Sequence, residues 1–316
     1  MGRIGFGCFA LSGAYGSARP EDAARTIHTA LDLGANLLDT SDAYAAGENE
    51  RLVGRALSGR RHEAVIATKF GWVLDASGQA RRLDSSPPHV RRACEASLER
   101  LGTDHIDIYL QHRVDPATPV EETVGELERL RDEGRIRAFG LSEAGPATIR
   151  RAAGVSPLAV LQTEYSLWSR EAESELLPLC AELDITFMAY SPLGRGFLAG
   201  GIRDRGDLEP DDFRRSQPRF EEENLRRNLT LVNRLAGVAA GAGCTPAQLA
   251  LAWVLAHPSR IVPIPATRRA EHVADNVGAL DVRLHPAELA AIAEILDSAR
   301  THGARHPEAH MRTIGL

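Results

Sequence analysis

The sequence predicts a single domain built as a (β/α)8 TIM barrel. Short apolar runs rich in β-branched residues alternate with longer segments in which apolar residues recur at helical spacing. Eight such runs can be distinguished along the chain, and eight parallel strands are the number that closes this barrel. The runs are mostly apolar rather than alternating, as expected for strands covered on both faces.

The predicted elements follow one another in a regular order. Strands are expected at Ile4–Cys8, Asn36–Asp39, Ala64–Lys69, Ile106–Leu110, Ile136–Leu141, Ala159–Gln162, Ile185–Tyr190 and Ile261–Ile264. Helices are expected between or after them, at Pro20–Leu33, Glu48–Ser58, His89–Leu101, Pro119–Glu133, Pro146–Ala153, Glu171–Leu183 and Arg269–Ala279. Glycine follows several of these helices and proline lies near several first turns, which supports the boundaries, as at Gly34, Gly102, Gly134, Pro20, Pro119 and Pro146.

One stretch departs from this alternation. The seventh strand is followed by a long loop, Ser191–Glu223, and then by two helices, Asn224–Ala240 and Pro246–His257, instead of one. A loop of this length without elements of its own is usually functional or mobile. A further helix is expected from Pro286 to Ser298, followed by a tail over residues 299–316. We find no linker or low-complexity segment and assign residues 1–316 to one domain.

The composition excludes several classes of function. A net charge of −6 and a pI near 6.0 argue against a nucleic-acid-binding surface and a polybasic membrane patch. No apolar stretch approaches the roughly 20 residues of a membrane span, and the N-terminus lacks a signal-peptide pattern. The four cysteines are widely spaced and are expected to be reduced, in a cytoplasmic protein. The oligomeric state stays open, and a homo-oligomer is compatible with the sequence.

Lys69 is the only lysine in the chain, although the chain has 37 lysine and arginine residues in total. An ammonium group differs from a guanidinium because its pKa shifts readily with burial and with neighbouring charges. Lys69 ends a buried strand, so we interpret it as a functional amine rather than a solvated surface lysine.

Three further polar side chains follow strand ends, where the active site of such a barrel lies. They are Asp39, His112 and, five residues after Asp39, Tyr44. A lysine ammonium beside a tyrosine lowers the pKa of the phenol, a buried aspartate holds the ammonium in place, and a histidine can orient a carbonyl oxygen. The set therefore suits proton transfer to a carbonyl oxygen. Taken singly, Asp39 could cap a helix, Tyr44 could be a partly exposed aromatic and His112 a structural histidine.

At these positions the chain resembles the aldo-keto reductase superfamily. The segment from Leu37 to Gly54 resembles the first signature of that family, and Ala67-Thr68-Lys69 and Tyr109-Leu110-Gln111-His112 match its lysine and histidine positions. The resemblance implies a barrel that binds NADPH in extended form, with Tyr44 as general acid supported by Lys69, Asp39 and His112. Because the sequence begins almost at its first strand, the family's hairpin across the barrel bottom is expected to be missing.

The resemblance also implies a set of cofactor-binding residues. Ser142, Glu143 and Gln162 fall where the family contacts the nicotinamide carboxamide, although the family has Asn in place of Glu143. Tyr190 matches the aromatic that stacks on the nicotinamide ring. The next six residues resemble the loop over the pyrophosphate, with Arg195 as its positive charge; they are Ser191, Pro192, Leu193, Gly194, Arg195 and Gly196.

A second group resembles the site for the 2′-phosphate and the adenine. It comprises Pro265, Ala266, Thr267, Arg268, Asp275 and Asn276. The planar guanidinium of Arg268 suits a phosphate. Ala266 replaces the usual glycine or lysine, and Asp275 replaces the usual glutamate. The resemblance implies NADPH in preference to NADH, and how strict this preference is stays open.

Two motifs are rejected as sites. Gly5-Phe6-Gly7-Cys8-Phe9-Ala10 spells a dinucleotide fingerprint, but almost no strand precedes it and no helix begins inside it. His302, His306 and His310 have a spacing that could present metal ligands, but Gly303 and Pro307 would interrupt the helix, so no metal is expected. We expect a mobile tail that borders the substrate pocket instead.

The function expected from this reasoning is NADPH-dependent reduction of a small-molecule aldehyde or ketone to an alcohol. The pocket-lining residues expected beyond the strand ends are Phe9, Tyr15, Trp72, Arg113 and Trp168. Arg113 hints at a polar or acidic substrate group. The nearest resemblance is to the bacterial and plant branch that acts on small aldehydes, quinones or sugar-like ketones. Two alternatives remain open: an NADPH-binding regulatory subunit with little turnover, and a barrel lyase that forms a Schiff base on Lys69.

Overall fold

A computed structural model of the chain describes residues 2–75 and 77–316, and eight parallel strands in it form one closed barrel. In barrel order the strands are β1 (Phe6–Gly7), β2 (Leu37–Asp39), β3 (Val65–Phe70), β6 (Ile106–Gln111), β7 (Ile136–Ser142), β8 (Val160–Glu164), β9 (Thr186–Tyr190) and β10 (Ile261–Ile264). The barrel closes between β1 and β10, because the Gly5 N–H donates to the Pro263 carbonyl at 2.9 Å and the Gly7 N–H to the Pro265 carbonyl at 3.1 Å. The predicted fold class is confirmed.

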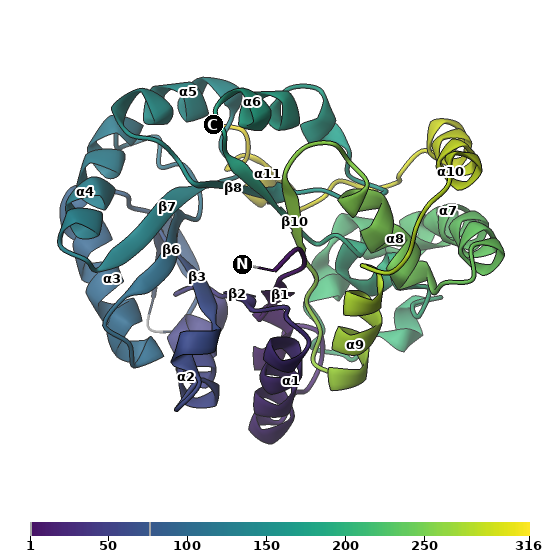
Figure 1. Cartoon of the computed structure of the whole chain (residues 1–316), viewed down its shortest axis with the longest axis horizontal. Coiled ribbons are helices and arrows are strands. Elements are labelled where there is room, and N and C mark those ends of the chain that lie inside the picture. The colour runs from purple at the N-terminus through teal and green to yellow at the C-terminus, as the bar shows by residue number, and fades with distance from the viewer. Residues whose placement is uncertain (1, 76) are drawn as a thin grey trace.

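Helices surround the barrel, which Figure 1 shows along its axis. Those of the β/α alternation are α1 (Pro20–Asp32), α2 (Glu48–Ala56), α3 (Pro87–Leu101), α4 (Val120–Asp132), α5 (Pro146–Val155), α6 (Leu176–Glu182), α8 (Pro246–Leu255) and α9 (Ala270–Gly278). The additional helices α7 (Glu222–Gly241) and α10 (Pro286–Ser298) pack together on one side. The sequence predicted α6 to begin earlier, but Glu171–Glu173 forms a separate 3-10 turn.

The strands are apolar on both faces because they lie between two cores. The barrel interior holds side chains such as Leu37, Ala67 and Leu110, whereas their neighbours Leu38 and Ile66 pack outward against the helices. This arrangement explains why the strands read as continuous apolar runs.

A hairpin after β3 was not predicted. Its strands β4 (Trp72–Leu74) and β5 (Ala80–Leu83) are antiparallel, and the Asp75 side chain accepts hydrogen bonds from the backbone N–H groups of Ser77 and Gln79. The hairpin is short, partly exposed and polar in β5, so it lacks the apolar pattern by which the other strands were recognised.

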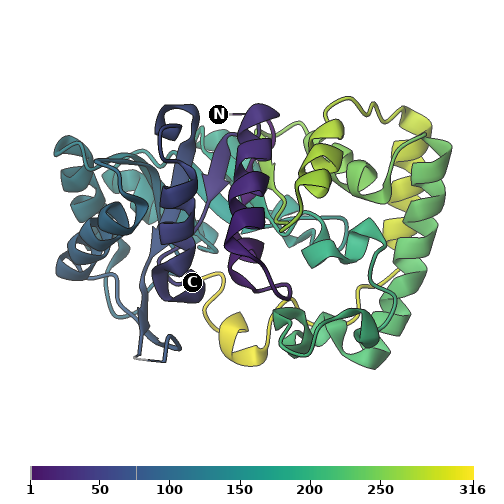
Figure 2. The same ribbon diagram turned by 90° about the horizontal axis from the view of Figure 1, so that it is seen from below.

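The C-terminal tail and the long loop also contain elements that the sequence did not predict. The tail forms the short helix α11 (Glu308–Met311), and the loop folds into 3-10 turns at Gly194–Ala199, Arg205–Asp207, Phe213–Ser216 and Pro218–Phe220. In Figure 2 the hairpin and α11 project from the end of the barrel opposite the N-terminus. Together with the long loop they form the walls around the carboxyl ends of the strands.

Residues 2–5, which precede β1, contain no strand. Among the described residues, no single helix is both long and apolar enough to cross a membrane. The pair α7 and α8 meets that test only when the two are taken together across an 86° bend.

Gly140 provides a test of the barrel packing. A Cβ atom at this position in β7 would lie 1.9 Å from the carbonyl oxygen of Val160 on β8, so the strands would have to separate. We expect Gly140→Ala to lower the free energy of unfolding by about 2–3 kcal/mol, measured by urea denaturation. As a control, Gly125→Ala in α4 meets no atom within 4 Å and should raise it by about 0.5–1 kcal/mol. Equal stabilities of the two variants would contradict this account.

Candidate active site

The centre of the site is a buried ion pair between Lys69 on β3 and Asp39 at the end of β2. Lys69 is 1% exposed and Asp39 4% exposed, and Nζ lies 2.8 Å from Oδ2. The ammonium also donates to the Thr40 carbonyl at 2.7 Å and to the Tyr44 hydroxyl at 3.1 Å. The other carboxylate oxygen, Oδ1, accepts from the side-chain amide of Gln162 on β8 at 2.7 Å. Each ammonium proton therefore has an acceptor, and both carboxylate oxygens have donors.

The chain holds Tyr44 beside the ion pair with a tight turn. Ala45 and Ala46 both have left-handed backbone conformations, with φ of 47° and 52°, which non-glycine residues adopt only at a cost in free energy. The side chain of the buried Asn49 anchors the segment before the turn through hydrogen bonds. Its amide accepts from the Thr40 hydroxyl at 2.6 Å and donates to the Cys8 carbonyl at 2.9 Å. The strained turn is thereby fixed to the first two strands.

The sequence predicted that Lys69 lowers the pKa of the Tyr44 phenol below its usual value, and for the chain alone this prediction is wrong. Burial raises the pKa of the Tyr44 phenol above its usual value, and the neighbouring Lys69 ammonium offsets this only in part. For Lys69, burial lowers the pKa, but the pairing with Asp39 and Tyr44 outweighs it and the pKa is raised. The phenol is therefore protonated and the amine charged near neutral pH.

His112 lies against the edge of Tyr44, with ring centroids 6.0 Å apart. Burial and the positive charges of Arg113 and Lys69 hold the pKa of His112 well below its usual value, so the imidazole is neutral. Its Nδ1 lies 3.1 Å from the hydroxyl of Ser41, which leaves Nε2 as the other polar atom of the ring. Ser41 was not among the predicted site residues, because a serine in a loop carries no distinctive pattern.

A cavity of about 270 Å³ opens beside these side chains. Most of the predicted site residues line it: Asp39, Tyr44, His112, Ser142, Gln162, Tyr190, Ser191, Pro192, Leu193, Arg195, Gly196, Pro265, Ala266, Phe9, Tyr15, Trp72 and Arg113. Sequence reasoning missed several other lining residues, which come from the hairpin and the long loop; these are Leu74, Gly78, Ala80 and Phe213. His306 and His310 also line it, so the tail borders the cavity as expected.

The prediction for Trp168 is wrong. Its side chain is 5% exposed and stacks on Phe197 at a centroid distance of 4.9 Å, behind the loop that lines the cavity. A Cβ on Gly194 would lie 2.6 Å from the indole, so the glycine allows the loop to pack directly against the ring. Position after a strand end could not show that the long loop covers this tryptophan.

Glu143 has a different environment from the one expected for a carboxamide contact. It is 2% exposed and does not line the cavity. Its carboxylate accepts from the Glu164 N–H at 3.1 Å and from the guanidinium of Arg305 in the tail at 3.3 Å. The Glu143 carbonyl also accepts from the Gly315 N–H at 2.8 Å, so this residue fastens the tail to the end of β7.

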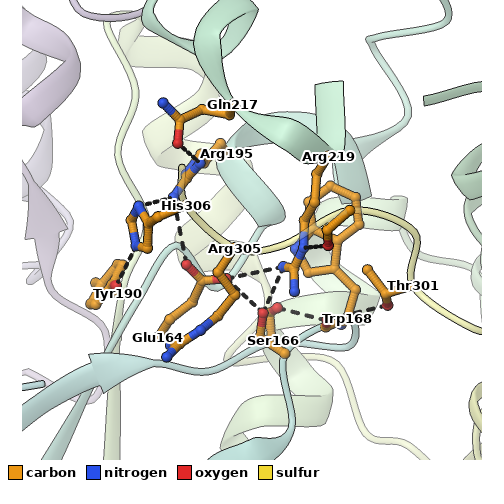
Figure 3. Close-up of polar contacts among 12 residues, drawn as sticks. Glu164, Ser166, Trp168, Tyr190, Arg195, Gln217, Arg219, Thr301, Arg305 and His306 are labelled. Carbon is orange, nitrogen blue, oxygen red and sulfur yellow. Dashed lines mark hydrogen bonds and ion pairs between the residues drawn. The ribbon is translucent and has the colours of Figure 1, made fainter. Parts of the chain in front are cut away.

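Arg195 is likewise held by protein groups. Its guanidinium donates to the Gln217 side chain at 2.9 Å, lies 3.2 Å from Nδ1 of His306 and is 3.7 Å from the buried carboxylate of Glu164 (Figure 3). The other ring nitrogen of His306 lies 3.2 Å from the Tyr190 hydroxyl. Burial and nearby cations lower the pKa of His306 to about 2, so it is neutral. The tail, the long loop and Tyr190 are therefore joined by one polar network.

Of the residues predicted to bind the 2′-phosphate and the adenine, Arg268 lines a second cavity, together with Ser17, Arg19, Arg25 and Arg269 and the carboxylates of Asp22 and Glu271 among others. Arg268 donates to the carboxylate of Glu209 at 3.0 Å and to the Ser17 carbonyl. The other predicted members have protein partners too. The Thr267 hydroxyl accepts from the Arg269 N–H at 3.1 Å, and Asp275 accepts from the Thr245 hydroxyl at 3.0 Å, whereas Asn276 is buried.

The rejected motifs behave as follows. Gly5 and Gly7 belong to the start of the barrel, and a 3-10 turn rather than a helix follows them at Phe9–Ser12. Within residues 2–75 and 77–316, no group of three or more His, Cys, Asp or Glu side chains could hold a metal ion.

Comparison with known proteins identifies the family. Residues 3–297 match the model of the Aldo/keto reductase family. The chain is 43% identical over 309 residues to the probable aldo-keto reductase 1 of Glycine max, covering 97% of this chain and 88% of that protein. The structure of a glycerol dehydrogenase from Gluconobacter oxydans is similar with a TM-score of 0.86 at 30% identity, covering 96% and 94% of the two chains. An aldo/keto reductase from Klebsiella pneumoniae in complex with NADPH has a TM-score of 0.76, with the same identity and coverage.

The chain therefore belongs to the aldo/keto reductase family. It is an oxidoreductase of a family that reduces carbonyl compounds.

The buried ion pair predicts a pattern of stabilities. Lys69→Met leaves the Asp39 carboxylate buried without its cation and should lower the free energy of unfolding by about 3–5 kcal/mol, measured by urea denaturation. In the double variant Asp39→Asn/Lys69→Met the unpaired charge is removed, so part of the loss should be recovered. A double variant less stable than Lys69→Met alone would contradict the interpretation.

Proposed function

We propose that this protein reduces a small aldehyde or ketone to the alcohol with NADPH, and that Tyr44 donates the proton. The observation that carries the proposal is the contact of the buried Lys69 ammonium with both Asp39 and the Tyr44 hydroxyl, at the edge of a cavity lined by Tyr44 and His112. A phenol held beside a fixed positive charge can lose its proton to a carbonyl oxygen, because the ammonium stabilises the phenolate that remains.

The residues around the cavity fit a reduced nicotinamide cofactor. Ser142 and Gln162 offer polar side chains beside the catalytic group, and Tyr190 offers an aromatic ring in the same cavity. Gly194 and Gly196 have positive φ, which lets the backbone of their loop approach a pyrophosphate closely. The arginine-rich second cavity has the donor set for a 2′-phosphate, and the related Klebsiella pneumoniae enzyme is a complex with NADPH. This supports NADPH rather than NADH.

Each side chain of the site would have a separate role in the reaction. Bound NADPH would supply a hydride to the carbonyl carbon. Tyr44 gives its proton to the carbonyl oxygen, Lys69 stabilises the resulting phenolate, and Asp39 keeps the amine charged and in place. His112 orients the same oxygen by a hydrogen bond from its neutral ring. Substrate contacts are assigned to Phe9, Tyr15, Trp72 and Arg113.

The direct test is a panel of aldehydes and ketones assayed with NADPH and with NADH side by side. We expect consumption of NADPH with formation of the alcohol, and a lower kcat/KM with NADH. Tight NADPH binding without turnover of any carbonyl would favour a regulatory subunit. Trapping of a substrate adduct on Lys69 by borohydride would favour a Schiff-base lyase.

A substitution separates the proton donor from cofactor binding. Tyr44→Phe removes the acidic hydroxyl but keeps the ring that packs on Phe9 at 4.9 Å. Turnover should fall by about 100- to 10,000-fold, the range for general acid catalysis, while the Kd for NADPH, measured by fluorescence titration, stays nearly the same. Loss of binding together with turnover would contradict the role given to Tyr44.

The pH dependence of reduction provides a further test. The pKa of Tyr44 is raised and that of His112 lowered, so neither group titrates near neutral pH. Burial raises the pKa of Asp42 to about 7, and its carboxylate lies 3.2 Å from the Ser41 hydroxyl that contacts His112. Once ionised, Asp42 can only accept a hydrogen bond, so the Ser41 hydroxyl donates to it. Ser41 must then accept from Nδ1 of His112, which leaves Nε2 without a proton to donate.

We therefore expect kcat/KM for reduction to decrease as the pH rises through about 7. Asp42→Asn stays neutral throughout, so this inflection should be absent from its pH profile. An inflection of the same size in the variant would show that another group is responsible.

A further inference from the structure

We propose that the preferred substrates carry an anionic group, such as a carboxylate, which Arg113 binds while the carbonyl lies against Tyr44 and His112. This inference rests on the proposed carbonyl reduction and specifies its substrate class. It follows from the charges and the hydrogen-bond donors of the cavity wall.

Arg113 differs from the other cations at the site because it has no carboxylate partner. Lys69 is paired with Asp39, and Arg195 lies 3.7 Å from Glu164. Arg305, which reaches the site from the tail, is paired with Glu143. Among residues 2–75 and 77–316, no carboxylate oxygen lies within 4.0 Å of the Arg113 guanidinium.

The hydrogen bonds of Arg113 leave most of its donors available. Nη1 donates to the carbonyl of His112 at 2.6 Å and lies 3.4 Å from the Ser142 hydroxyl. No described residue accepts from Nη2 or Nε, although the side chain is part of the cavity wall and only partly exposed. One edge of the planar guanidinium group is thus held by the protein, and the N–H donors of the other edge are free to bind a planar anion.

The rest of the cavity wall carries little negative charge. Asp39 is its only carboxylate in the described part of the chain, and both oxygens of Asp39 already accept hydrogen bonds. The indole N–H of Trp72 and the ring nitrogens of His310 have no partner among the described side chains, and the two rings meet edge to face at 6.2 Å. An anion would satisfy the free donors of Arg113, whereas a neutral apolar substrate would leave this partly buried cation unpaired.

The position of Arg113 sets where the anion must lie. It directly follows His112 in the chain, and its carbonyl-bound Nη1 keeps the guanidinium close to that residue. A substrate whose carboxylate lies a few bonds from its carbonyl could therefore place the carboxylate against Arg113 and the carbonyl oxygen against His112 at once. Ser142 is also close to Arg113, so a role in holding the nicotinamide is the competing interpretation that the experiment must exclude.

The experiment compares matched pairs of substrates. Wild-type enzyme and variants are assayed with NADPH on 3- and 4-carboxybenzaldehyde and on the corresponding neutral amides, 3- and 4-formylbenzamide. We expect the wild type to show a higher kcat/KM for the acid in at least one pair. In Arg113→Gln that preference ratio should fall about 10- to 100-fold, with Arg113→Lys intermediate because it keeps the charge but loses the fork. Arg129→Gln, at an exposed position on α4, serves as the matched control and should keep the ratio.

The outcomes separate this inference from the proposed function. Reduction of the amides and acids without any preference, or an equal loss on both in Arg113→Gln together with weaker NADPH binding, would overturn the role of Arg113 and leave carbonyl reduction standing. Failure to reduce all four compounds together with the wider panel of aldehydes and ketones would overturn both, whereas turnover of that panel without turnover of these four would overturn only the substrate class. NADPH titration of each variant shows that it is folded and separates a cofactor role from a substrate role.

Discussion

A charged amine buried inside the mouth of the barrel is the constraint on which the site depends. Removing two ions from water costs free energy that their mutual attraction returns only if the geometry is good and the remaining polar atoms are satisfied. Here Asp39 neutralises Lys69, while Thr40 and Gln162 complete the hydrogen bonds of the pair. These partners come from β2, from the residue that follows it and from β8, so the pair has its full set of hydrogen bonds only when these strands are assembled in the barrel.

The ion pair also determines what Tyr44 can do. Its hydroxyl is the third partner of the ammonium, and a turn with two left-handed alanines holds it there. In the free protein the phenol keeps its proton because burial has the largest effect on its pKa. In the proposed reaction the ammonium would stabilise the phenolate that forms as the proton leaves, which is the point at which a fixed charge contributes most.

A second layer of contacts encloses the site from parts of the chain far apart in sequence. Glu143 binds Arg305, and His306 lies between Tyr190 and Arg195 (Figure 3). The last residues of the chain thereby determine the position of groups on β9 and on the loop after it. Among the described residues, Arg113 is the cation of this enclosure that lacks a carboxylate partner, and we propose that the cavity selects the charge of its substrate through this group.

The sequence by itself predicted the barrel, its eight strands and the four neighbouring side chains Asp39, Tyr44, Lys69 and His112, because periodicity and strand ends are local patterns that survive folding unchanged. It could not show that the long loop covers Trp168, or that Glu143 contacts Arg305 and Arg195 contacts His306. Nor could it show that Ser41 contacts both His112 and Asp42. Those facts depend on how the hairpin, the long loop and the tail pack over the strand ends. Short, polar and irregular segments carry no periodic signal, and their positions are set by contacts between residues more than 100 positions apart, such as Glu143 and Arg305.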